Sequence, residues 1–268
     1  MSGRGLRTYA LLYLVFLYAP IFLLPLFAFN DASTITFPLK GFTTRWFSEL
    51  WGIQAMRAAV LTSLKVAAIS ALAATALGVC AAMAVTRYPF RGQKGLMGLI
   101  MLPLVLPEII VAVALLVVIL RLGLDTGTWA VIAGHTLICV PFAIAILTTA
   151  FAALDGSLEE AAADLGAGRI ATFRLVTLPL VMPGIISALL ISFTISMDEF
   201  IIAFFLTSGE PTLPVYLWSM LRFPKQLPAV MALGTILVVL SILLLSIAEY
   251  YRRRGIRRAG GNITGGVL

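Results

Sequence analysis

The chain has 268 residues, of which 61% are hydrophobic and 12% are charged. Its mean hydropathy of +1.05 indicates an integral membrane protein and excludes an ordinary soluble domain. The net charge of +7 is attributed to membrane topology and to contact with anionic lipid headgroups, not to nucleic-acid binding.

Six apolar runs are long enough to cross a bilayer core, which takes roughly 20 helical residues. The alternating ten-residue pattern of a membrane barrel is absent, and a helix satisfies its own backbone in lipid. The sequence therefore predicts an all-α integral membrane protein with a single transmembrane domain over 1–268. The predicted spans are 9–29, 58–85, 96–120, 129–151, 180–206 and 228–250.

Lysine and arginine are concentrated before the first span, in alternate connections and in the tail. Short connections rich in these residues stay in the cytoplasm, so both termini are predicted to be cytoplasmic. The first apolar run is too long for a cleaved signal and is expected to be retained. A glycosylation sequon at 262–264 is attributed to chance, because it falls in the cytoplasmic tail. The basic residues are Arg4, Arg7, Arg87, Arg91, Lys94, Arg169, Arg174, Arg252, Arg253, Arg254, Arg257 and Arg258.

The segment 42–51, between the first two predicted spans, has aromatic residues spaced for one face of a short helix. Two interpretations stay open for Trp46, Phe47 and Trp51. They either anchor the chain at the outer membrane interface or pack against the outer ends of neighbouring spans.

The third predicted span contains an acid beside two prolines. Pro103 and Pro107 free backbone groups and permit local unwinding where a span lines a cavity. An ionisable side chain inside a span costs about 2.5–3.5 kcal/mol unless it faces protein or water. Glu108 is therefore a candidate for the solute path, with a structural pairing on a neighbouring span as the open alternative.

The histidine and the two cysteines in the predicted spans give little indication of a functional site. His135 is the one histidine in the chain, and we expect it to make a polar contact between helices instead of binding a metal. Cys80 and Cys139 lack the spacing of a redox or zinc motif and are expected to be reduced packing residues.

The connection 152–178 contains a polar, helix-favouring segment. Ser157 is expected to cap a short helix with Glu160 as its capping-box partner, Gly166 to end it, and Pro179 to mark the return to the membrane. Connections between packed helices usually have only a few residues. The segment is therefore predicted to seat in a socket on a cytoplasmic partner.

Asp198 and Glu199 come late in the fifth predicted span. Adjacent residues point roughly 100° apart on a helix, so only one of them is expected to face a central path while the other is paired. Asp198 is the favoured path residue. A cation such as a protonated polyamine is attracted to such carboxylates.

The chain lacks an energy source of its own. None of its lysines is followed by Ser or Thr, so the phosphate-binding loop Gly-x4-Gly-Lys-Ser/Thr is absent. The chain is therefore predicted to be no enzyme and to hold no cofactor, with ATP and Mg²⁺ bound by a separate ATPase subunit.

The segment from Glu160 to Pro179 resembles the signature of permease subunits of binding-protein-dependent ABC importers, Glu-Ala-Ala-x3-Gly-x9-Ile-x-Leu-Pro. In that family the segment forms a coupling helix that seats in a groove of the ATPase, and the resemblance implies this role for 160–168. It also implies the six-helix type I permease fold. The matching residues are Glu160, Ala161, Ala162, Gly166, Leu178 and Pro179, with Val176 in place of Ile.

The resemblance narrows to the spermidine/putrescine type of permease through 102–109, 134–135, 195–205 and 213–219. It implies a polyamine as cargo. Members of that subfamily more often have two aspartates where this chain has Asp198 and Glu199, so an opine, an amino-acid-like compound or another small amine stays an alternative.

The resemblance further implies a bacterial inner-membrane complex. Its other parts are a second, distinct permease, two ATPase copies and an extracytoplasmic binding protein. An ion-driven secondary transporter is an alternative, but it is expected to show inverted repeats in a longer chain. A structural scaffold is another, but it has no need for acids beside prolines within its spans.

Overall fold

The computed structural model describes residues 3–88 and 90–258, and within these ranges the chain is helical apart from its connections and one isolated bridge. This confirms the all-α prediction for the described residues. The chain forms two compact units, one of residues 1–54 and 217–268 and the other of residues 55–216. The sequon at 262–264 lies outside the described residues.

In the first unit, α1 (Gly3–Ala28) packs against α12 (Leu227–Arg258), and α2 (Arg45–Gly52) also contacts α12. The α1–α12 contact is close because Gly234 lacks a side chain. A Cβ atom at Gly234 would lie 3.2 Å from a methyl carbon of Leu24.

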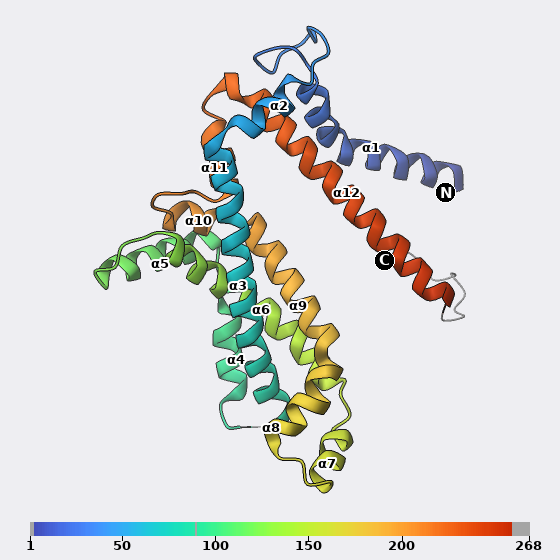
Figure 1. Ribbon diagram of the computed structural model, residues 1–268, viewed down its shortest axis with the longest axis vertical. Coiled ribbons are helices and arrows are strands. Elements are labelled where there is room, and N and C mark those ends of the chain that lie inside the picture. Colours follow the sequence, from blue (N-terminus) through green and yellow to red (C-terminus); the bar gives the residue numbers. More distant parts are fainter. Residues whose placement is uncertain (1–2, 89, 259–268) are drawn as a thin grey trace. The chain divides into compact units, whose positions relative to one another are not determined.

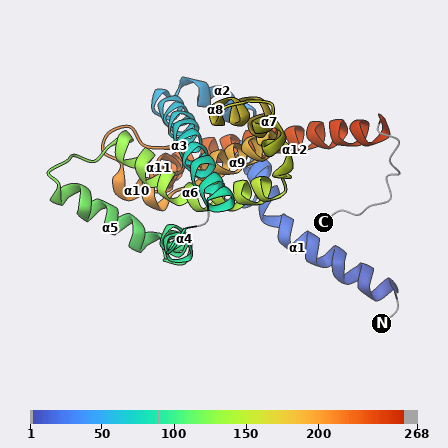
Figure 2. The same ribbon diagram turned by 90° about the horizontal axis from the view of Figure 1, so that it is seen from below.

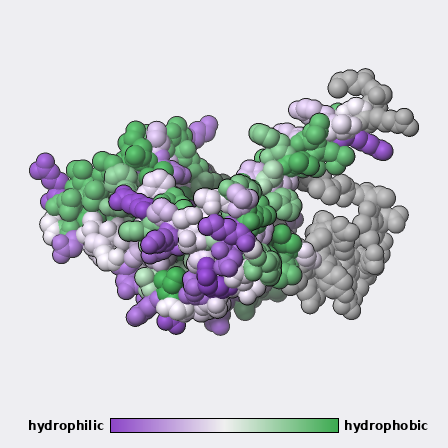
Figure 3. Space-filling model, turned by 90° about the horizontal axis from the view of Figure 1, so that it is seen from above, coloured by the Kyte–Doolittle hydropathy of each residue, from purple (hydrophilic) through white to green (hydrophobic). Residues whose placement is uncertain are grey.

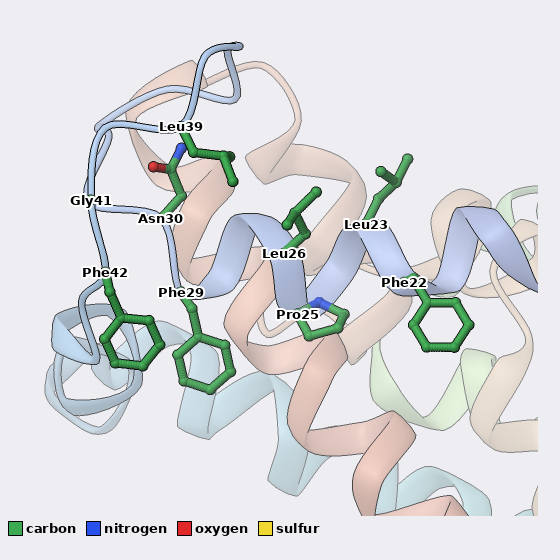
Figure 4. Close-up of a pocket in the computed structure, with 9 residues that line it drawn as sticks. All are labelled: Phe22, Leu23, Pro25, Leu26, Phe29, Asn30, Leu39, Gly41 and Phe42. Atoms are coloured by element: carbon green, nitrogen blue, oxygen red, sulfur yellow. The ribbon is translucent and has the colours of Figure 1, made fainter.

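The loop between α1 and α2 folds around Trp46. This residue is only 6% exposed, and its indole Nε1 donates a hydrogen bond to the carbonyl oxygen of Asn30 at 2.9 Å. The rings of Phe29 and Phe42 stack with centroids 5.2 Å apart (Figure 4). Trp46 is thus a packing residue, and the interface-anchor interpretation is wrong for it, whereas Trp51 is 69% exposed.

In the second unit, three long helices pack around one apolar core cluster: α3 (Gln54–Arg87), α6 (Thr128–Ala152) and α9 (Leu178–Asp198). Small residues let these helices approach closely, as is common in membrane proteins. A Cβ atom at Gly184 would lie 2.5 Å from the Cβ of Ala150, and one at Gly78 would lie 3.0 Å from the Cβ of Ala143. Many outward-facing side chains are apolar, and Figure 3 shows them as broad green areas.

Polar contacts join α6 to α9 inside this core. His135 is fully buried, and its Nδ1 lies 2.7 Å from the hydroxyl oxygen of Ser196. The thiol of Cys139 lies 3.4 Å from the carbonyl oxygen of Ser192. The expected interhelical contact of His135 is confirmed. Cys80 and Cys139 are both free thiols, but only Cys139 is buried, so the expected packing role is wrong for the exposed Cys80.

The third predicted span is not one helix. It consists of α4 (Gln93–Met101), the short 3-10 turn η1 (Leu102–Leu104) and α5 (Glu108–Arg121), and the two parts are bent by 102°. Proline removes a backbone donor and disfavours, without forbidding, a helical conformation in the residue before it. The chain becomes extended at Pro107, which has a ψ of 130°, so the local unwinding predicted at the prolines is a full break, and Glu108 begins the helix that follows it.

The fifth predicted span ends early. The chain leaves α9 at Asp198 and forms α10 (Ile201–Leu206) and α11 (Leu213–Met220), followed by the turn η3 (Pro224–Gln226). Among the described residues, four helices are long and apolar enough to cross a membrane, or five if the bent pair counts as one span. The described apolar part of the last helix, 224–240, is shorter. Six spans and two cytoplasmic termini stay predictions.

Candidate functional site

The predicted docking segment is a short helix, α7 (Ser157–Asp164). It does not begin with the predicted capping box, because Ser157 is already inside the helix. The carboxylate of Asp155 takes the capping role and accepts a hydrogen bond from the backbone N–H of Ser157 at 3.0 Å. This bond lowers the pKa of Asp155.

The helix ends at Gly166 as predicted. Gly166 has a φ of +84°, a conformation that glycine adopts without strain. Its N–H donates to the carbonyl of Ala163 at 2.9 Å, and the N–H of Ala167 donates to the carbonyl of Ala162 at 3.0 Å. These two bonds form a Schellman motif, which satisfies the last carbonyls of the helix.

The helical stretch that follows the docking segment begins before Pro179. The helix α8 (Arg169–Thr172), the π-helical turn η2 (Phe173–Thr177) and α9 form one stretch over 169–198. Pro179 lies in the first turn of α9 and cannot donate a backbone hydrogen bond, and such gaps are often accommodated by a wider turn. The helical stretch thus begins ten residues before Pro179, while the predicted entry into the membrane at Pro179 stays a prediction.

The α7 helix lies beside α8 (Figure 1 and Figure 2), and none of its residues is buried. Glu160, Ala161 and Gly166 are exposed, and Ala162 is half-buried. Leu165 and Ile170, which flank the exit turn, are 89% and 84% exposed. The segment thus presents an acid and two large apolar side chains to its surroundings.

Sequence reasoning missed the contacts that hold α7 in place. Glu159 Oε2 lies 2.7 Å from Nε of Arg87, the last residue of α3. The hydroxyl of Thr177 donates to Glu159 Oε1 at 2.6 Å, and Arg87 Nη2 donates to the carbonyl of Leu154 at 3.3 Å. The sequence analysis used Arg87 only to predict which connections are cytoplasmic, and the position of Arg87 in the sequence did not indicate a contact with Glu159.

The three acids predicted for the solute path surround one cavity of about 810 Å³. They come from three different places: the start of α5, the end of α9 and the connection from α9 to α10. The structure therefore brings together residues that the sequence analysis had treated separately. The lining residues are Pro103, Leu104, Leu106, Pro107, Glu108, Ile138, Phe142, Ile195, Asp198, Glu199, Phe200 and Ile201.

The two adjacent acids differ in their surroundings. Glu199 is 7% exposed, and its Oε1 accepts the backbone N–H of Ile202 at 2.8 Å in the first turn of α10. Asp198 and Glu108 are exposed. The geometry agrees with one paired and one open acid, while the role of Asp198 in a solute path stays a prediction.

Two further cavities lie elsewhere. One of about 720 Å³, in the first unit, is lined by apolar residues with Asn30 as the one polar side chain among its described lining residues (Figure 4). The other, of about 370 Å³, lies beside α7 and is lined by Arg87, Glu159 and Arg169 among others. The acid-lined cavity is therefore the one suited to attract a cation.

The chain matches the family model described as "Binding-protein-dependent transport system inner membrane component" over residues 74–258. It is 34% identical over 265 residues to the spermidine/putrescine transport system permease protein PotC of Shigella flexneri, covering 98% of this chain and 100% of that protein. It is 36% identical over 264 residues to the putrescine transport system permease protein PotI of Escherichia coli (strain K12), covering 93% of each.

Solved structures share the fold at lower identity. A chain of a bacterial ABC transporter that imports the acidic polysaccharide alginate matches with a TM-score of 0.72 and 16% identity, covering 92% of this chain and 95% of that one. A chain of the MetNI methionine ABC transporter in an inward-facing conformation matches with a TM-score of 0.58 and 18% identity, covering 78% of this chain and 98% of that one.

Proposed function

Since the chain belongs to the family of binding-protein-dependent transport system inner membrane components and is the permease subunit of an ABC importer, we propose that it forms half of the translocation path for a polyamine. The relatives that transport spermidine and putrescine support this cargo class. The single observation that carries it is the cavity lined by Glu108, Asp198 and Glu199.

The charge of this cavity fits a cation. Three carboxyl groups line it, and none of its described lining residues is basic. Repulsion between carboxylates is relieved when a cation binds among them. Phe142 and Phe200 also line the cavity, and aromatic faces attract ammonium groups. A linear diamine or triamine satisfies both features at once, with charged groups near the acids and methylenes along the apolar wall.

The remainder of the importer is proposed as follows. The exposed face of α7 docks on an ATPase, of which two copies bind ATP and Mg²⁺ in the cytoplasm. A second, distinct permease completes the path in the bacterial inner membrane, and an extracytoplasmic binding protein delivers the solute. Six spans and cytoplasmic termini belong to the same proposal.

ATP hydrolysis by the ATPase drives the solute path through conformational changes. Closure of the ATPase dimer moves the docked α7 helices, and the path alternates between inward-facing and outward-facing states. ATP acts through its different contacts in the two states and does not touch the cargo. The cavity acids need to bind the cation only weakly, because a tightly held solute does not leave.

Reconstitution of the complete transporter in liposomes tests the proposal. We expect ATP-dependent accumulation of labelled spermidine or putrescine, with competition by other linear polyamines. Acetylation of the amino groups removes their charge and should abolish competition. Accumulation of an opine or an amino-acid-like compound, with no polyamine transport, would contradict the polyamine assignment and retain the importer.

A further inference from the structure

The Glu159 latch, defined here as Glu159 with Arg87 and Thr177, joins three elements of the second unit. Glu159 lies on α7, Arg87 is the last residue of α3, and Thr177 is the last residue of η2 directly before α9. Both oxygens of one carboxylate are used, one by the guanidinium and the other by the hydroxyl.

The surroundings of the latch are partly shielded from water. The side chains of Arg87 and Glu159 are 21% and 20% exposed, and Thr177 is 1% exposed. An ion pair that is fully exposed contributes little, because water and salt screen it. In this shielded place water screens the ion pair less, and the hydrogen bond from Thr177 to a charged oxygen is stronger than one between neutral groups.

Apolar packing does not hold α7 against the rest of the unit. None of its residues is buried, and a cavity of about 370 Å³ lies next to it. The chain leaves α7 through the left-handed turn at Gly166. Within the described residues, the latch therefore connects the helix with α3 through an ion pair and with the residue before α9 through a hydrogen bond.

We propose that the Glu159 latch transmits the movement of α7 to α3 and α9, so that Glu159 and Arg87 are positioning residues for coupling. The inference rests on the proposed docking of α7 on an ATPase. It divides two neighbouring acids between two tasks: exposed Glu160 faces the ATPase, while Glu159 faces its own chain. Without the latch, α7 moves with the docked ATPase but does not move α3 and α9.

The test measures solute transported per ATP hydrolysed in the complete, reconstituted transporter with loaded binding protein. We expect Arg87→Gln and Glu159→Gln each to lower this ratio roughly fivefold or more, the lower end of coupling between protein sites. The ATPase should still co-purify. The double variant should be no worse than either single variant, because paired residues are not additive. Arg91→Gln, which removes an exposed charge outside α7, is the matched control.

Thr177 gives a second test if an arginine variant fails to insert. Thr177→Ser keeps the hydroxyl donor and should retain the wild-type ratio, whereas Thr177→Val should lower it. Equal ratios in these two variants would overturn the latch. So would unchanged ratios in the Arg87 and Glu159 variants, multiplicative losses in the double variant, or loss of the ATPase from Glu159→Gln.

The same assay separates the latch from the docking on which it rests. Glu160→Lys should release the ATPase, whereas the latch variants should retain it. Normal ATPase binding and normal transport in Glu160→Lys would remove the docking role. Defective Glu160→Lys beside wild-type latch variants would remove the latch alone.

Discussion

The docking segment and the acid-lined cavity, both in the second unit, differ in how their residues are brought together. Residues 155–167 form their helix, cap and exit turn through contacts between near neighbours in the chain. The cavity needs the ends of α5 and α9 to meet, and these lie far apart in sequence. Contacts between near neighbours thus form the docking segment, whereas the acid-lined cavity depends on the helix breaks before α5 and after α9.

We expect the largest effect from a substitution that disrupts only the docking segment. Gly166→Val forces a β-branched residue into a left-handed conformation, which costs roughly 1–2 kcal/mol even for simpler side chains. We expect uptake to be abolished and ATPase stimulation by loaded binding protein to fall with it. Gly168→Ala is the control, because Gly168 has a φ of −70° and open space around its Cα. Normal stimulation in Gly166→Val would sink the docking assignment.

The next largest effect is expected from a substitution in the acid-lined cavity that leaves the docking segment intact. Asp198→Asn removes a charge at nearly constant volume, and uptake of a polyamine should fall roughly tenfold, equivalent to about 1.4 kcal/mol. The amount of assembled transporter should stay unchanged. Glu199→Gln should be milder, because its amide oxygen can still accept the N–H of Ile202. Equal uptake in wild type and both variants, at matched membrane abundance, would make these acids structural.

A smaller effect concerns how α10 is held beside the cavity. A Cβ atom at Gly134 would lie 2.5 Å from Cγ2 of Ile202, so Gly134→Ala overpacks this contact. Overpacking costs typically 1–3 kcal/mol, and the melting temperature should fall by about 2–4 °C per kcal/mol. Gly98→Ala, which meets open space in α4, is the control. A melting temperature in Gly134→Ala that matches the control would contradict the close packing.

The smallest effect concerns the cap of α7. Its hydrogen bond to Ser157 lowers the pKa of the Asp155 carboxyl, so the cap contributes stability at neutral pH and loses it as the pH falls through the folded pKa. Hydrogen exchange of the first α7 amides should accelerate in Asp155→Ala, with uptake nearly unchanged. The variant should also lose the acid dependence of the wild type. Unchanged exchange would show that another group caps the helix.

The sequence predicted what depends on nearby residues. The exit at Gly166 follows from a glycine after a helix-favouring run, and the break in the third span was anticipated at Pro103 and Pro107. For His135 the sequence predicted a polar contact between helices, but it did not predict that Ser196 is the partner. The exit at Gly166 and the break at the prolines depend on local backbone chemistry, which short motifs record.

Long-range geometry could not be predicted from the same patterns. The 102° bend between α4 and α5 depends on packing, and a proline shows only that a break is permitted. The pairing of Arg87 with Glu159 joins residues separated by α4, α5 and α6, so no spacing rule connects them. The cap was assigned to Ser157 because the expected helix began one residue later than the structure shows.

The most direct test of the central claim, that α7 couples this permease to a cytoplasmic ATPase, is the side of the membrane on which its loop lies. In a background without Cys80 and Cys139, Gly168→Cys should react with an impermeant thiol reagent only after the membrane is opened. Ser33→Cys, in the loop before α2, should react from outside and serves as the positive control. Reaction of Gly168→Cys in intact cells would place the loop away from ATP and contradict the importer orientation.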